Sequence, residues 1–111
     1  MKLIFAVINS NDTNDATEAL TNSGFGVTKL SSTGGFLKKG NTTLMLGVED
    51  DKVETVIAIL KEKCAQRMET EVSVPYIGTN ASMYHVTAYP VEVQAGGAVV
   101  FSVDVSEFWR F

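Results

Sequence analysis

The sequence predicts a single α+β domain, residues 1–111, of the ferredoxin-like βαββαβ type with one extra strand at its C-terminal end. The first observation is order: apolar runs of strand length alternate with two helix-like segments as strand, helix, strand, strand, helix, strand. The second is size: the 111 residues are 45% hydrophobic and 20% charged, which is typical of one globular domain with one core.

The first strand and the first helix are expected near the N-terminus. Residues 2–8 form a nearly continuous apolar run, as in a central strand that is covered on both faces. A helix should follow, because Asn11 or Thr13 can cap its first backbone N–H groups. Gly24 stands where a helix C-terminus favours glycine.

Two further strands should flank a glycine-rich loop. Residues 25–30 alternate in the manner of a strand, with Thr28 and Leu30 on the face opposite Phe25. Residues 43–48 read as the third strand.

The second helix has the clearest pattern in the chain. Its acidic start at residues 49–51 matches the positive end of a helix dipole. One buried face is predicted at positions i, i+3, i+4, i+7 and i+11, namely Val53, Val56, Ile57, Leu60 and Cys64.

The last third of the chain is expected to hold a long loop and a hairpin. Residues 66–86 show no clear periodicity, which predicts a loop of functional importance. Residues 89–94 and 98–103 read as the fourth and fifth strands, and the segment 95–97 has the composition of the hairpin turn between them.

Two helices can cover only one face of such a sheet. The chain has too little material left to cover the apolar residues that face the other way. A homotrimer with stacked sheets would bury this second face, and a homodimer is the simpler alternative.

The charge distribution points to an anionic ligand. The chain carries a net charge of −4, yet residues 19–48 contain no acidic residue and hold Lys29, Lys38 and Lys39. Glycines in the loop 33–43 allow backbone N–H groups to approach a phosphate-sized anion, although a solvated, flexible hairpin would show the same features. A nucleoside triphosphatase is disfavoured, because Asn41 replaces the lysine of the phosphate-loop motif and a strand follows.

Several other functional classes are disfavoured. Neither a catalytic site nor a metal or cofactor site is predicted: His85 is the single histidine, and Cys64 falls on an apolar helix face, as an inert core residue would. A pI near 4.8 argues against nucleic-acid polymers as partners. No segment has the roughly 18 apolar residues of a membrane span, and the lone cysteine fits a reducing cytoplasm.

Five motifs together resemble the PII-like cyclic di-AMP receptor family of Gram-positive bacteria. They are Thr28-Lys29-Leu30, Thr33-Gly34-Gly35-Phe36-Leu37, Gly40-Asn41-Thr42-Thr43, Tyr89-Pro90-Val91-Glu92-Val93 and Gly96-Gly97-Ala98-Val99-Val100-Phe101. The resemblance runs from end to end. It implies a cytoplasmic homotrimer that signals to an unidentified protein, with a nucleotide site at each subunit cleft. A short loop at 34–40 and a long loop at 67–88 would lie at the mouth of each cleft.

The resemblance also implies ligand contacts for individual residues. Gly35, Phe36 and Leu37 would hold a phosphate with backbone N–H groups, and the side-chain amide of Asn41 would donate to it. Thr28 would bind an adenine edge, and Gly47 would leave room for the base. Close packing or a β-bulge would also explain Gly47, and a core position would also explain Phe36.

Two departures from the family pattern affect the ligand. Gly24 and Gly26 stand where family members have asparagine and arginine, and Trp109-Arg110 replaces a His-Gln pair. Arg110 would compensate if it reached the cleft of a neighbouring subunit, although a terminal arginine is more often solvated. The sequence thus leaves two alternatives. One is a cyclic di-AMP receptor with weakened binding; the other is a divergent paralogue that senses another anion or acts only as a protein-interaction module.

Overall fold

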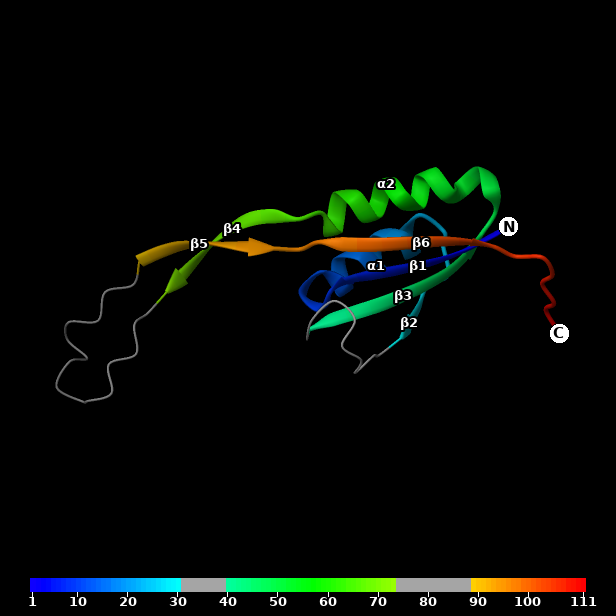
Figure 1. The fold of residues 1–111 in the computed structure, drawn as a ribbon, viewed down its shortest axis with the longest axis horizontal. Helices are drawn as coiled ribbons and strands as arrows, with labels where there is room; N and C mark the ends of the chain where they lie inside the picture. Colours follow the sequence, from blue (N-terminus) through cyan, green and yellow to red (C-terminus); the bar gives the residue numbers. More distant parts are fainter. Residues whose placement is uncertain (31–39, 74–88) are drawn as a thin grey trace.

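The computed structural model describes residues 1–30, 40–73 and 89–111, which form two antiparallel sheets and two α-helices (Figure 1). The elements are β1 (Lys2–Asn9), η1 (Ser10–Asp12), α1 (Thr13–Asn22), β2 (Thr28–Leu30), β3 (Asn41–Val48), η2 (Asp50–Lys52), α2 (Val53–Cys64), β4 (Arg67–Ser73), β5 (Tyr89–Ala95) and β6 (Ala98–Asp104). The main sheet has the order β2-β3-β1-β6, and β4 and β5 form a separate two-stranded ribbon.

The predicted α+β class is confirmed, and the main sheet is consistent with a ferredoxin-like fold. β1 lies between β3 and β6 and is antiparallel to both. The position of the extra strand was predicted wrongly. β6 is itself the fourth strand of the main sheet, whereas β5 leaves that sheet to pair with β4.

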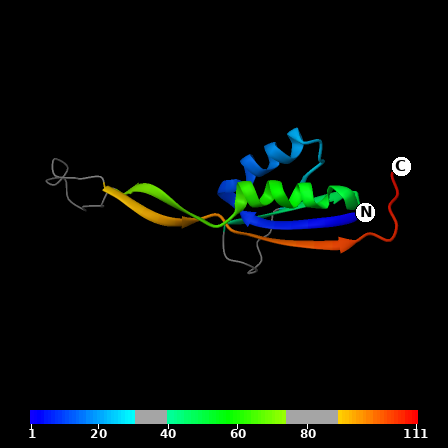
Figure 2. The ribbon, with the colours of Figure 1, turned by 90° about the horizontal axis from the view of Figure 1, so that it is seen from above.

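The core lies between the main sheet and the two helices, which both cover the same face of the sheet (Figure 2). The alternation of β1 and β3 places every second side chain under these helices. The buried hydrophobic residues are Ile4, Ala6, Ile8, Ala16, Leu20, Leu44, Leu46, Val48, Val56, Leu60 and Cys64.

Both helices begin with a short 3-10 turn that the sequence pattern does not show. Asp12, rather than Asn11 or Thr13, precedes the first residue of α1, and its side chain makes no capping hydrogen bond. Gly24 has a φ of +91° just after α1, so the predicted glycine at this helix end is confirmed.

The predicted inner face of α2 is largely correct. Val56, Leu60 and Cys64 are buried and Val53 is half-buried, but Ile57 is 37% exposed. Ile57 lies beside the edge strand β6, where the sheet ends and leaves its outer side uncovered.

The sheet face opposite the helices, here called the open face, is strongly apolar. Its strands present Leu3, Phe5, Val7, Leu30, Met45, Val99, Phe101 and Val103. Phe101 is 46% exposed and Val103 is 49% exposed, and the rest are half-buried or exposed. The expectation of an uncovered second face is therefore confirmed.

The ribbon of β4 and β5 corrects two predictions. Residues 67–73, expected to be part of a loop, form a strand that pairs with β5 from Arg67 opposite Ala95 to Ser73 opposite Tyr89. The segment 95–97 is not a hairpin turn, because it passes from the ribbon into the main sheet. The ribbon extends away from the body at the end where β3 begins (Figure 1).

Candidate functional site

Three residues expected to bind the ligand lie on one face of the sheet. Asn41 and Gly47 are both in β3 with an even spacing, so they point to the same face. Thr28 pairs with Met45, which lies between them in the same alternation. Together they define a strip on the open face, about 20 Å long by the rise of a strand.

The Asn41 end of this strip lies at the base of the ribbon. Gly40, with a φ of +88°, accepts a hydrogen bond from the backbone N–H of Ser10 at 2.7 Å. Asn41 is half-buried, pairs with Asn9 in the sheet, and lines a cavity of about 720 Å³. This cavity reaches the ribbon base, where Gln66 and Gln94 also line it. The predicted phosphate-binding residues Gly35, Phe36 and Leu37 lie outside the described residues.

The other end of the strip opens onto a second cavity, of about 340 Å³. Its lining brings together Gly24, Gly26 and Gly47, which are the two family departures and the residue expected to make room for a base. A Cβ at Gly47 would meet no atom within 4 Å. The register of β1 and β3 runs through Gly47 without a bulge, opposite Leu3. Among the described residues, neither close packing nor a β-bulge therefore explains this glycine.

Gly24 and Gly26 differ in what they allow. A Cβ at either position would have no neighbour within 4 Å. Only Gly24 has a positive φ, of +91°, a conformation in which asparagine is among the better tolerated replacements. Among the described residues, nothing lies where the asparagine and arginine expected from the family resemblance would place their Cβ atoms.

Of the three lysines in the acid-free segment 19–48, only Lys29 is among the described residues. Lys29 pairs with the buried Leu44 and lines a groove against α1 together with Glu18, so it lies on the helix side of β2. Lys38 and Lys39 lie outside the described residues.

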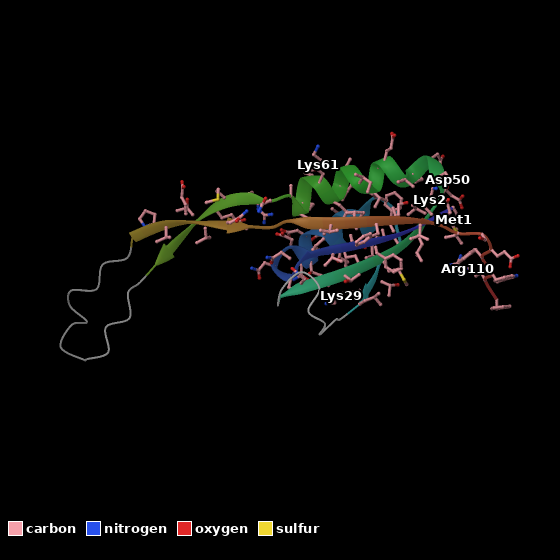
Figure 3. All side chains as sticks on the ribbon, in the orientation of Figure 1. Met1, Lys2, Lys29, Asp50, Lys61 and Arg110 are labelled. Carbon is pink, nitrogen blue, oxygen red and sulfur yellow. The ribbon has the colours of Figure 1, made fainter. Side chains whose placement is uncertain are left out.

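Arg110 is solvent-exposed in the tail that follows β6. Figure 3 shows it at the end of the molecule opposite the ribbon. Arg110 is not among the described residues that line the two cavities above.

Sequence reasoning missed an ion pair that joins the ribbon to the start of α1. Arg67 Nη2 lies 2.6 Å from Asp12 Oδ1, Nη1 lies 3.3 Å from Oδ2, and Nε lies 2.9 Å from Glu69 Oε1. Hydrogen bonding to Asp12, and to a lesser extent to Glu69, holds the pKa of the Arg67 guanidinium above its ordinary value. Asp12 and Arg67 are 55 positions apart, and no local motif relates them.

The described residues offer little for redox or metal chemistry. Burial raises the pKa of the Cys64 thiol to about 11, so at neutral pH the sulfur is protonated and unreactive. Within residues 1–30, 40–73 and 89–111, no group of three His, Cys, Asp or Glu side chains is arranged to hold a metal ion. Over the same residues, no helix is both long and apolar enough to cross a membrane.

Known proteins share both the sequence pattern and the fold of this chain. The family model described as "Cyclic-di-AMP receptor" matches residues 1–111. A solved structure of a functionally unknown protein from Pediococcus pentosaceus ATCC 25745 is similar, with 35% sequence identity and a TM-score of 0.78. This similarity covers 99% of this chain and 96% of that chain. Because the family match spans all 111 residues, the chain belongs to the cyclic-di-AMP receptor family.

Proposed function

We propose that this protein is a trimeric signalling receptor that binds cyclic di-AMP on the open face of its sheet. The observation that supports this proposal is the strip of Thr28, Asn41 and Gly47, which ends at the base of the ribbon. Family membership supplies the class of ligand. Thr28 and Asn41 offer a hydroxyl and an amide for hydrogen bonds, and Gly47 offers an unfilled space.

The apolar character of the open face supports self-association. Val99, Phe101 and Val103 are each more than a third exposed along one strand, which is costly for a face left in water. Stacking three open faces around a common axis removes this apolar area from water. We propose that in such a trimer Arg110 in the exposed tail of one subunit contacts the ligand bound by another.

We expect binding to be weaker than in family members that have asparagine and arginine at the positions of Gly24 and Gly26. An arginine donates paired hydrogen bonds to a phosphate or stacks on a base, and glycine does neither. Losing such a contact costs about 2–3 kcal/mol, which is tens to a hundredfold in affinity.

Titration calorimetry with cyclic di-AMP tests the proposal. The parent should give measurable heat at high ligand concentration, and Gly26→Arg should tighten binding about tenfold or more. Gly47→Ala should weaken binding about tenfold while leaving the unfolding midpoint unchanged, because its Cβ meets nothing within the chain. Lys63→Ala, which removes a lysine of α2 that lines neither cavity, serves as the control, and Figure 3 shows the helix that carries it.

The second candidate is a protein-interaction module of the same fold that no longer binds the nucleotide. Gly24 and Gly26 favour this candidate, because they offer no side chain that could bind the nucleotide. The ribbon that projects from the body also favours it, as a surface for a protein partner (Figure 1). If Gly26→Arg and the parent both remain trimeric and neither gives heat with cyclic di-AMP, the receptor proposal is wrong and this candidate replaces it.

A further inference from the structure

The ribbon of β4 and β5 depends on contacts at its base. It is a two-stranded sheet, and such a sheet alone is only marginally stable in water. Met68 and Thr70 in its first strand are exposed, so none of the described residues covers this part of the ribbon. Its direction relative to the body is therefore set where Arg67 and Gly97 meet the domain.

Arg67 makes the main side-chain contact at this base. It binds Asp12 with two nitrogen atoms, at 2.6 and 3.3 Å, and its Nη1 also lies 3.3 Å from the carbonyl oxygen of Ala65. The Asp12 side chain is only 4% exposed, whereas the acidic partners in the other ion pairs of the described residues are 46% exposed or more. A bidentate hydrogen bond to a buried carboxylate fixes the orientation of the guanidinium far better than an exposed ion pair does.

Asp12 ends a short segment whose first residues contact the beginning of β3. The segment 9–12, here called the β1–α1 turn, contains Ser10, whose backbone N–H donates to Gly40 O at 2.7 Å. The Ser10 hydroxyl lies 3.0 Å from the hydroxyl of Thr42. These two contacts flank Asn41, and Asn9 pairs directly with Asn41 in the sheet.

The β1–α1 turn is also internally braced. The side chain of Asn9 accepts a hydrogen bond from the backbone N–H of Asn11 at 2.9 Å, and Ser10–Asp12 form a 3-10 turn. Ser10 and Asp12 are thus the two ends of one hydrogen-bonded turn.

We infer that the β1–α1 turn is a positioning element that sets the direction of the ribbon and couples it to the Asn41 end of the strip, through Ser10 on one side and the Asp12–Arg67 pair on the other. The part that concerns the ligand rests on the proposed function. The mechanical part does not, because it requires only that a change at Ser10 or Thr42 alters the ribbon. Coupling of this kind is reciprocal, so either end can be perturbed to detect it.

The mechanical part is tested without ligand, by hydrogen–deuterium exchange of β4 and β5 relative to α2. Asp12→Asn keeps the shape of the side chain and removes its charge, so it should speed exchange in both ribbon strands about tenfold, with α2 unchanged. Asp104→Asn is the matched control, since Asp104 pairs with Lys2 at the other end of the sheet. Ribbon exchange that stays at the parental rate in Asp12→Asn, or rises equally in Asp104→Asn, overturns the inference.

If Asp12→Asn speeds exchange throughout the domain, its effect on the ribbon cannot be separated from a general loss of stability. The variant Arg67→Lys then tests the inference. Lysine keeps the positive charge at a side chain that is 38% exposed but lacks the two-pronged geometry. A rise confined to β4 and β5 is again the expected result, and an unchanged ribbon in this folded variant counts against the inference.

A double-mutant cycle tests the coupling through Ser10. Ser10→Ala removes the hydroxyl contact with Thr42 and keeps the backbone bond to Gly40. It should speed ribbon exchange about threefold in the parent and have no effect when Asp12→Asn is present, because the path is already broken. Equal effects in both backgrounds would show that the turn does not couple the two sites.

The ligand arm separates this inference from the proposed function. If cyclic di-AMP binds, it should slow exchange in β4 and β5 of the parent several-fold and leave the ribbon of Asp12→Asn unchanged. Equal slowing in both proteins overturns the coupling while the receptor proposal stands. Absence of binding overturns only the receptor proposal, since the ligand-free cycle still decides the coupling.

Discussion

Replacing Gly96 with alanine should destabilise the protein more than the same change at the adjacent glycine. Gly96 has a φ of +75°, and a Cβ there would lie 2.5 Å from Ala65 O, 2.6 Å from Arg67 Nη1 and 3.1 Å from Cys64 O. Two of these atoms belong to the backbone at the end of α2 and cannot rotate away. Gly97 has a φ of +104°, but a Cβ there would meet nothing within 4 Å.

The comparison isolates the contact from the backbone conformation. Both variants place alanine at a positive φ, which costs about 1–2 kcal/mol. Gly96→Ala must also displace the carbonyl of Ala65 or move Arg67 away from Asp12, and such overpacking adds about 1–3 kcal/mol. We therefore expect about 1–2 kcal/mol for Gly97→Ala and about 3–4 kcal/mol for Gly96→Ala.

Urea denaturation at one protein concentration measures this difference, since self-association would otherwise shift the midpoint. With a slope of about 2 kcal/mol per molar urea, the two midpoints should differ by about 1 M. Hydrogen exchange of β4 and β5 reports whether the clash releases the ribbon alone. The argument fails if Gly96→Ala is no more destabilising than Gly97→Ala and leaves ribbon exchange at the level of that control.

Three other predictions concern the core, the open face and the buried thiol. Leu44→Ala, at a fully buried position, should cost about 3 kcal/mol in urea denaturation, whereas Ile57→Ala, at a position of α2 that is 37% exposed, should cost about 1 kcal/mol; similar costs would contradict the assigned core. Light scattering should show a homotrimer that Val103→Lys on the open face dissociates and Ser102→Lys on the other face does not, and a monomeric parent at micromolar concentration would refute self-association. Because burial raises the pKa of Cys64 from 9.0 to about 11, the unfolded chain loses the thiol proton first and stability should fall between these pH values. The fall should be smaller in Cys64→Ala, where only the ion pairs of Met1 and Lys2, whose pKa values are also raised, still contribute.

The features that the sequence predicted correctly depend on neighbouring residues. The apolar alternation of β1 and β3, the inner face of α2 and the glycine after α1 each follow from local periodicity or local backbone conformation. The uncovered apolar face follows from the same patterns, because two helices cannot cover both sides of a sheet.

The strip on the open face could be predicted in part from the sequence. The spacing of Asn41 and Gly47 in one strand already places both on one side, and Thr28 follows from the alternation of the preceding strand. Thr28 and Asn41 belong to the five motifs on which the family resemblance depends, and the family match over residues 1–111 confirms that assignment. Their contacts with a ligand stay a prediction.

Long-range pairing decided what local patterns could not show. Met68, Glu69 and Thr70 are all exposed, so burial imposes no period of two on this part of the strand Arg67–Ser73, whose pairing partner β5 begins sixteen positions after it ends. The same pairing turned the expected hairpin at 95–97 into a junction between two sheets. Likewise, the sequence by itself predicted a helix start at residues 11–13, but only the tertiary structure brought Arg67 to the carboxylate of Asp12, because a buried charge needs a partner and the fold decides which one lies beside it.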